Sequence, residues 1–240
     1  MPNEAPAGAP LAIVTGASSG IGQAVTLQLL AQGWQVIGLQ RGTPAIAHPA
    51  FRAVALDLAD GDAVSRAAAT LPTPQALVHA AGVMRGGRLG ELPAADAALM
   101  WRLHVDAAIR LADALLPRMA AAGPGGPHRS IVLVGSRTAH GQPGKAAYAA
   151  SKAALVSLAR SWAAEVVAQG VTVNVVAPAA TDTPMLADPA RAGTPPRLPP
   201  MGRLIRPDEV AALVVYLLGE AAAPITGQEI QVCGGSSLPR

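Results

Sequence analysis

A tyrosine and a lysine lie four residues apart in the alanine-rich stretch AAYAASKAAL, residues 146–155. Alanine is the best helix former, and residues four apart share one face of a helix, so Tyr148 and Lys152 are neighbours if the stretch is helical. A free tyrosine hydroxyl, with a pKa of about 10, is a poor base near neutral pH. A cation about 4 Å away supplies about 4 kcal/mol, enough to bring that pKa near 7. The pair is therefore suited to proton transfer; the alternative is a contact between exposed side chains.

Ser136 is a third polar residue in a position suited to chemistry. It ends the apolar run SIVLVGS, which predicts a buried strand, and it precedes Tyr148 by twelve residues. The carboxyl ends of parallel strands meet at one edge of a sheet, and ligands bind there. We therefore expect Ser136, Tyr148 and Lys152 to converge at such an edge.

The glycine-rich segment TGASSGIG, residues 15–22, joins the apolar run LAIVTG to a helical pattern over residues 20–32. Glycines at 16, 20 and 22 permit a tight turn and let a pyrophosphate approach the N–H groups of a helix N-terminus. A mononucleotide P-loop is excluded because no Gly-Lys-Ser/Thr follows. The segment predicts a dinucleotide-binding turn, with an ordinary glycine turn as the alternative.

The same segment also contains the G-x-S-x-G pattern of a serine-hydrolase nucleophile elbow, with Ser18 as the nucleophile. That elbow needs an acidic residue and then a histidine later in the chain, and it usually follows several strands. Asp57 and His79 have the required residue types, but the segment follows the first strand. His79 also ends an apolar strand, where a structural role is equally expected. A hydrolase stays a disfavoured alternative.

Apolar runs alternate with helical patterns along the whole chain. Seven runs are expected to be strands: LAIVTG, WQVIGLQ, FRAVALD, QALVHAAG, SIVLVGS, VTVNVVAP and QEIQV. Helices are expected near residues 20–32, 63–70, 93–121, 146–169 and 207–218. Strands separated by helices pair in parallel, so the sequence predicts an α/β fold: a Rossmann-like, doubly wound, seven-stranded parallel sheet with helices on both faces.

One domain is expected over residues 11–240, after a short disordered leader, residues 1–10, that lacks the features of a signal peptide. The Pro-rich segment 181–204 has no periodicity and follows the sixth predicted strand. Long loops in compact domains are usually functional or disordered, and this one leaves the ligand-binding edge of the sheet. It predicts a substrate loop.

The composition excludes several classes of protein. The formal charge of +3 comes mainly from scattered arginines, without a run that could follow a nucleic-acid backbone. The single cysteine, Cys233, can form no internal disulfide and suggests no metal site, which fits a reducing compartment and a cytoplasmic location. The run VAALVVYLLG is too short to span a bilayer. We expect a small-molecule substrate, and neither nucleic acid nor a membrane as a partner.

Together the motifs resemble the short-chain dehydrogenase/reductase family, in its branch of roughly 250-residue subunits, over residues 11–235. TGASSGIG matches the family's TGxxxGxG turn, and Asp57 in LDLAD matches its adenine-contacting aspartate. HAAG at 79–82 stands where NNAG is common, and SRTAHGQPGKAAYAASK supplies the Ser and YxxxK elements. NVVAPAATDTP resembles NxxxPGxxxT, and residues 202–235 resemble the usual carboxyl end.

The resemblance implies an oxidoreductase that interconverts a carbonyl and an alcohol by direct hydride transfer from or to a nicotinamide. Tyr148 would exchange a proton with the substrate oxygen, Ser136 would hydrogen-bond that oxygen, and Lys152 would hold the nicotinamide ribose. A homodimer or homotetramer is implied, with the helix of Tyr148 at an interface. The implied cofactor-binding residues are Gly16, Ser18, Ser19, Gly20, Ile21, Gly22, Gln40, Arg41, Asp57, Leu58, Ala80, Ala81, Gly82, Tyr148, Lys152, Pro178, Ala179, Thr181 and Thr183.

His104 stands where the family commonly has a catalytic asparagine, counting back from LLPRM. An imidazole can take part in a proton relay, so we include His104 among the catalytic candidates; the alternative is a structural histidine. Ala80, Ala179 and Cys233 also depart from the family pattern. These departures leave open a second class of function, a dinucleotide-binding regulatory module without turnover.

The end of the second predicted strand bears on the choice between NAD and NADP. A carboxylate there binds the ribose 2′-OH and repels a 2′-phosphate, but this chain has Gln40 followed by Arg41. An arginine can pair with a phosphate, so NADP(H) is predicted; the alternative is a solvated arginine. The candidate substrate-pocket residues are Arg85, Arg88, Thr138, His140, Gln142 and Met185, and Arg85 or Arg88 could receive an anionic substrate.

Overall fold

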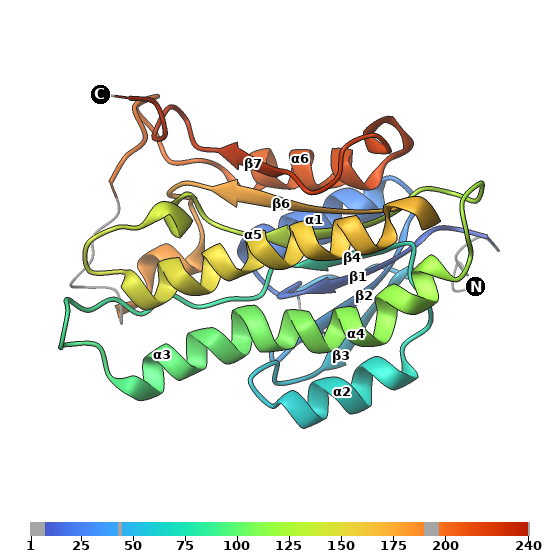
Figure 1. The fold of residues 1–240 in the computed structure, drawn as a ribbon, viewed down its shortest axis with the longest axis horizontal. Coiled ribbons are helices and arrows are strands. Elements are labelled where there is room, and N and C mark those ends of the chain that lie inside the picture. The colour runs from blue at the N-terminus through green and yellow to red at the C-terminus, as the bar shows by residue number, and fades with distance from the viewer. Residues whose placement is uncertain (1–7, 43–44, 190–196, 240) are drawn as a thin grey trace.

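Seven parallel strands form the centre of the protein (Figure 1). The computed structural model describes residues 8–42, 45–189 and 197–239. The strands are β1 (Leu11–Thr15), β2 (Gln35–Gln40), β3 (Phe51–Ala55), β4 (Ala76–His79), β5 (Arg129–Val134), β6 (Val171–Pro178) and β7 (Glu229–Val232). They lie in the order β3-β2-β1-β4-β5-β6-β7, and each neighbouring pair is parallel.

Helices cover both faces of this sheet. They are α1 (Gly20–Ala31), α2 (Gly61–Thr70), α3 (Ala94–Trp101), α4 (Ala107–Ala120), α5 (Ala146–Val166) and α6 (Pro207–Leu218). Successive side chains of a strand point to opposite faces. Ile13 therefore packs in the core beneath α2, α4 and α5, whereas Val14 packs in the core beneath α1 and α6 (Figure 1). The predicted doubly wound sheet is confirmed.

Burial along the strands follows their place in the sheet. Every residue of β5 and of β6 is buried, because helices cover both faces of these strands. The edge strands β3 and β7 have no fully buried residue. The apolar runs in the sequence therefore correspond to buried strands in the middle of the sheet and to partly buried or exposed strands at its edges.

A π-helical turn interrupts the helix predicted over residues 93–121. α3 runs into the π-helical segment η1 (Arg102–Asp106), which runs into α4. Hydrogen bonds in a π turn reach five residues back instead of four, which rotates the following side chains, and such turns are frequent at functional sites. This turn buries His104, whose ring reaches the segment that follows β4.

The segment after β6 is described only in part. Residues 181–189 include a short 3-10 helix, η4 (Pro184–Ala187), and Thr181 forms an isolated bridge with Ile205. Residues 190–196 of the predicted substrate loop lie outside the described residues, as do residues 1–7 of the predicted leader.

The order of the strands reverses between β1 and β4. From β1 the chain moves outward to β2 and β3, and it then returns to β4 on the other side of β1. The connections that follow β1 and β4 lie on opposite faces, which leaves a crevice at the carboxyl ends of both strands.

Among residues 8–42, 45–189 and 197–239, no helix is long and apolar enough to cross a membrane, and no group of three metal-ligating side chains occurs.

Candidate active site

A cavity of about 900 Å³ lies at the carboxyl ends of the strands, where their order reverses. Its wall is built from the turn after β1, the segments after β4, β5 and β6, and the first turns of α5. Ser136, Tyr148 and Lys152 all line it. The structure therefore brings together the three side chains that the sequence singled out.

The glycine turn after β1 leaves no space for side chains. Gly16 has a φ of +70°, and a Cβ there would lie 3.0 Å from the Cα of Ala81. A Cβ on Gly22 would lie 2.3 Å from the carbonyl oxygen of Gly16. The N–H of Gly16 bonds to the carbonyl of Leu39, which fixes the turn against β2. This tight turn exposes backbone at the N-terminus of α1 and fits a dinucleotide pyrophosphate.

Thr15 and His79 tie the ends of β1 and β4 together. The Oγ1 atom of Thr15 accepts the N–H groups of Ala80 and Ala81, both at 3.0 Å, so its own hydrogen is available for Nδ1 of His79 at 3.1 Å. Nε2–H of His79 then donates to the carbonyl of Leu103 at 3.1 Å. Burial, followed by the charge of Lys152, lowers the pKa of His79 to about 4. His79 is thus a neutral structural histidine and does not pair with Ser18.

His104 has partners on both ring nitrogens. The N–H of Val83 donates to Nε2 at 3.1 Å, so Nδ1 carries the proton and donates to the hydroxyl of Ser151 at 2.8 Å. Ser151 in turn donates to the carbonyl of Tyr148 at 2.8 Å. Burial, followed by the charges of Lys152 and His79, lowers the pKa of His104 well below its usual value. A neutral imidazole therefore links the segment after β4 to the helix that carries Tyr148.

Lys152 lines the buried side of the cavity, with 4% of its surface exposed. Its Nζ donates to the carbonyl of Val134 at 2.9 Å and lies 5.9 Å from the centre of the Tyr148 ring. Burial lowers the pKa of Lys152 to about 7. An ammonium group has three N–H donors, and the bond to Val134 uses one, so the others can serve ligands in the cavity.

Ser136 is buried at the end of β5 and caps the short 3-10 helix η2 (Arg137–His140). Its Oγ accepts the N–H of Thr138 at 3.2 Å and lies 2.8 Å from the Thr138 hydroxyl. These bonds fix the serine oxygen at the cavity wall. If Thr138 donates its hydroxyl, the hydrogen of Ser136 is directed to a ligand.

Comparison with known proteins identifies the family. A family model described as enoyl-(acyl carrier protein) reductase matches residues 16–237. The chain is 35% identical to 2,3-dihydro-2,3-dihydroxybenzoate dehydrogenase of Escherichia coli K12 and 34% identical to the 3-oxoacyl-[acyl-carrier-protein] reductase of that organism. Each match covers 94% of this chain and 96% of the relative. The chain belongs to the short-chain dehydrogenase/reductase family.

Solved structures of short-chain dehydrogenase/reductases have the same fold. One family member, at 34% identity, superposes with a TM-score of 0.85 and 98% coverage of both chains. A protein from Beutenbergia cavernae, described as an NAD(P)-dependent gluconate 5-dehydrogenase and solved with NADP bound at low occupancy, superposes with a TM-score of 0.81 at 30% identity, over 94% of this chain and 96% of that one. The protein is thus an oxidoreductase acting on CH–OH and C=O groups, in a family that binds nicotinamide dinucleotides.

Most of the cofactor-binding residues implied by the short-chain dehydrogenase/reductase motifs line the cavity. Four do not: Ser18, Gln40, Asp57 and Leu58. Leu58 is buried in the core, and the Asp57 carboxylate accepts the N–H of Ala59 at 2.9 Å. The predicted residues that do line the cavity are Gly16, Ser19, Gly20, Ile21, Gly22, Arg41, Ala80, Ala81, Gly82, Tyr148, Lys152, Pro178, Ala179, Thr181 and Thr183.

The end of β2 carries two side chains with different surroundings. Arg41 is exposed and lines the cavity. Gln40 is buried, and its Nε2 donates to the carbonyl of Gly42 at 2.9 Å, while its Oε1 has no partner among the described residues. The buried amide fixes the end of β2 and leaves Arg41 as the charged group that faces the cavity there.

The structure brings only some of the candidate substrate-pocket residues to the cavity. Thr138, Gln142 and Met185 line the cavity, whereas Arg85, Arg88 and His140 do not. Arg85 bonds to Asp188 at 2.9 Å, so it is an ion-pair partner of the segment after β6.

Several residues of the cavity wall were not identified from the sequence. They lie within or beside segments that the sequence analysis named, but their own positions carried no signal, and the three-dimensional fold brings them to the site. Those that matter below are Arg137, Lys145, Asp188 and Arg197.

Proposed function

We propose that this enzyme transfers hydride between NADP(H) and a small carbonyl or alcohol substrate, with Tyr148 as the acid and base. The observation that carries the proposal is the lining of one cavity by Ser136, Tyr148 and Lys152 beside the glycine turn. The dinucleotide supplies or accepts the hydride when bound. The protein's task is then to position the substrate and to move one proton.

Tyr148 is the group that we assign to the proton. In reduction its hydroxyl donates to the carbonyl oxygen, and in oxidation the tyrosinate accepts the proton of the alcohol. Ser136 donates a hydrogen bond to the same oxygen. Lys152, close to the tyrosine ring, favours the tyrosinate by its positive charge.

Arg41 supports a preference for NADP(H). It lines the cavity at the end of β2, where the neighbouring residue, Gln40, is uncharged, so a 2′-phosphate meets a cation and no carboxylate from β2. The related structure with bound NADP is consistent with this preference.

The Arg41→Ala variant tests the cofactor preference. We expect it to raise KM for NADPH at least about tenfold, which is about 1.4 kcal/mol, and to change KM for NADH much less. Arg52→Ala, an exposed arginine on β3, is the matched control. Equal losses with both dinucleotides would refute the preference.

His104 is better suited to positioning than to the predicted proton relay. Nε2 accepts from the backbone N–H of Val83, and Ser151, the partner of Nδ1, donates to the backbone carbonyl of Tyr148, so the chain of hydrogen bonds ends on backbone groups at both ends. We propose that the neutral ring holds the first turns of α5, and with them Tyr148, against the segment after β4. The ring also packs edge-on against the Tyr148 ring, with centroids 5.6 Å apart.

Two tyrosines in the chain provide a matched pair of variants for the main test. NADPH oxidation is measured with a panel of ketones, 3-oxoacyl thioesters and quinones. We expect Tyr148→Phe to lower kcat at least about a hundredfold while NADPH still binds, because only the proton donor is lost. Tyr216→Phe, on the half-exposed tyrosine of α6, should retain activity. Undiminished turnover by Tyr148→Phe would exclude the assignment.

The assembly and the substrate loop are part of the same proposal. We propose that segment 181–204 closes over the substrate and that the enzyme forms a homodimer or homotetramer through α5, as the family resemblance implies. The two relatives named above differ in the substrates that their names give, a 2,3-dihydro-2,3-dihydroxybenzoate and a 3-oxoacyl-[acyl-carrier-protein].

A further inference from the structure

We propose that the substrate of this enzyme carries a free carboxylate, held by Lys145 with support from Arg137 and Arg197. The proposal rests on the proposed function, because it assigns a substrate class to the same cavity. It differs from the sequence-based expectation that Arg85 or Arg88 receives an anion.

The charges that line the cavity are strongly unbalanced. Among the described residues, five cationic side chains line the wall and one anionic side chain does. Arg41, at the end of β2, and Lys152, beside Tyr148, have the roles already given. The cations without a role in cofactor binding or proton transfer are Arg137, Lys145 and Arg197.

Asp188, the one anionic side chain among the described wall residues, has an arginine partner. The Asp188 carboxylate accepts from Arg85 at 2.9 Å, and Arg85 itself does not line the cavity. Arg85 is also 4.0 Å from Asp96 of α3. The charge of Asp188 is thus shared with an arginine from outside the wall, and the cationic side chains among the described wall residues still outnumber it.

Lys145 has a position from which its charge can act on a bound substrate. It is 8% exposed, lines the cavity and directly precedes α5, three residues before Tyr148. Lys145 and Tyr148 both line the cavity, so the two side chains border the same space. A cation surrounded by protein attracts an anion more strongly than one in water, because the effective dielectric constant is lower.

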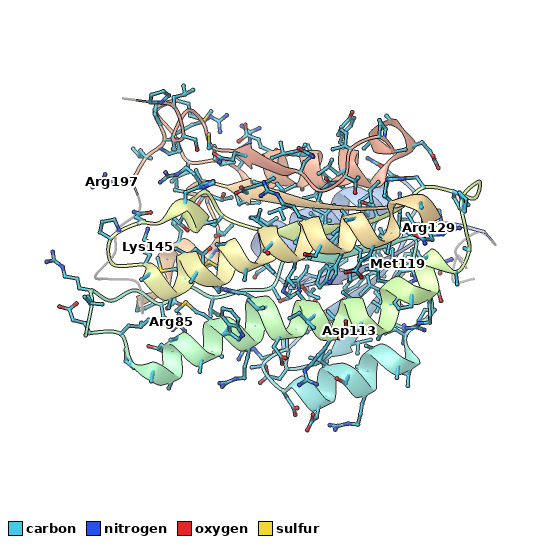
Figure 2. All side chains as sticks on the ribbon, viewed as in Figure 1. Arg85, Asp113, Met119, Arg129, Lys145 and Arg197 are labelled. Carbon is cyan, nitrogen blue, oxygen red and sulfur yellow. The ribbon has the colours of Figure 1, made fainter. Side chains whose placement is uncertain are left out.

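Arg137 and Arg197 extend the same positive wall. Arg137 directly follows Ser136, and the two arginines also border a smaller hollow with Gln142 and Pro143. Figure 2 shows that Lys145 and Arg197 lie at the same end of the molecule as the carboxyl ends of β6 and β7. A substrate whose reacting carbon lies at Tyr148 therefore has cations within reach of its other end.

A carboxylate is the anion that suits a small hydride acceptor at this wall. It leaves the ketone or alcohol carbon uncharged for reaction and needs only one lysine and one arginine for a tight pair. Acyl carrier thioesters have no free carboxylate beside the carbonyl, so the proposal separates this enzyme from a reductase of acyl carrier substrates.

The test compares an acid with its own ester. NADPH oxidation is measured with 4-oxocyclohexanecarboxylate and with methyl 4-oxocyclohexanecarboxylate, which share the ketone and the ring. We expect kcat/KM to be at least about tenfold higher for the acid, and this advantage to shrink between low salt and about 0.2 M salt. Equal values for acid and ester would refute the proposal.

Lys145→Met locates the effect. It should abolish most of the advantage of the acid, largely through KM, because kcat/KM falls much more for the acid than for the ester. Lys145→Arg should retain part of the advantage. Arg160→Met, an exposed arginine of α5 that does not line the cavity, is the control. Equal losses for acid and ester in Lys145→Met would also refute the proposal, because they indicate a structural role.

A binding measurement separates this proposal from the proposed function. Cyclohexanecarboxylate has no carbonyl to reduce, so its binding to Tyr148→Phe with NADP⁺ does not depend on turnover. We expect it to raise the Tm of that complex, and cyclohexanecarboxamide to raise it less. If neither ketone is reduced but the acid alone stabilises the protein, the proposed function fails and the carboxylate site stands. If the acid and the amide act equally, the carboxylate site fails.

Discussion

Two buried histidines, His79 and His104, flank Lys152 in opposite tautomers. His79 carries its proton on Nε2 and His104 on Nδ1, because each accepts a hydrogen bond on the other nitrogen. Both pKa values are lowered by burial first and by the charge of Lys152 second. The folded protein therefore resists protonation at these two sites in a pH range where an unfolded chain accepts protons.

This difference predicts that the protein is labile to acid. Both folded pKa values lie below the ordinary value of 6.5, that of His79 at about 4, so the stabilisation is present above pH 6.5 and is lost as the pH falls toward 4. Each histidine contributes a slope of about 1.4 kcal/mol per pH unit to the free energy of unfolding. The pKa of Lys152 is lowered from 10.5 to about 7, so its contribution to the pH dependence of stability falls in a separate pH range, between about 7 and 10.5. Urea unfolding measured between pH 4 and 6.5 checks the slope.

His104→Asn should make that slope shallower by about 1.4 kcal/mol per pH unit, whatever it does to the stability at neutral pH. An unaltered slope in His104→Asn would show that His104 accepts its proton as readily in the folded as in the unfolded protein.

Gly82 has no side chain and so leaves room for the imidazole ring of His104. A Cβ on Gly82 would lie 2.8 Å from Nε2 of His104 and 3.6 Å from Nζ of Lys152. We predict that Gly82→Ala displaces the imidazole, costs about 1–3 kcal/mol of stability and lowers kcat at least about tenfold. Gly219→Ala is the control, since its nearest neighbour would be the Tyr216 carbonyl at 3.4 Å. Parent-like activity of Gly82→Ala would contradict the positioning role of His104.

At the scale of elements, the strands could be predicted and the irregular segments could not. All seven strands have apolar runs, and α6 begins and ends at the predicted residues, with Pro207 at its first position. The π turn over Arg102–Asp106 has no comparable signal, because it depends on how the backbone packs against the segment after β4. The wall residues Lys145 and Arg137 were missed for a related reason: a lone basic residue beside a glycine- and proline-containing loop looks solvated in the sequence.

The ion pair between Arg85 and Asp188 joins the segment after β4 to the segment after β6, and its contribution can be tested. Arg85 and Asp188 are 22% and 31% exposed at their side chains, so the pair is worth at most about 1 kcal/mol. We predict that Asp188→Asn leaves global stability within about 1 kcal/mol but accelerates proteolytic cleavage in residues 181–204 several-fold. Asp62→Asn, in a pair 3.9 Å from Arg110 with 85% exposure, should not change the cleavage rate. Equal cleavage rates in both variants would show that the ion pair does not hold this segment.

On the scale of the whole molecule, one sheet separates two apolar cores. Leu115 is fully buried in the core with α2, α4 and α5, and Leu29 is fully buried in the core with α1 and α6. Because both cores pack on the same seven strands, we propose that they unfold together, as the single domain expected from the sequence would.

Shortening one buried leucine in each core tests whether the two cores unfold together. We predict that Leu115→Ala and Leu29→Ala each cost about 2–5 kcal/mol and that each keeps one unfolding transition by calorimetry and by circular dichroism. Leu27→Ala, at a half-exposed leucine of α1, should cost much less. Two separate transitions in either core variant would show that the cores fold independently.

The parallel pairing of β1 with β4 also limits how early the cofactor site can form. Thr15 and His79, which bond across this pair, lie 64 residues apart in the chain, and a parallel pair cannot be closed by a hairpin. At a synthesis rate of roughly 5–20 residues per second, the glycine turn leaves the ribosome roughly 3–13 seconds before the strand that completes its crevice. During that interval, the edge of β1 that later pairs with β4 has no partner strand. A dinucleotide can therefore help to stabilise the nascent chain only after β4 has been made.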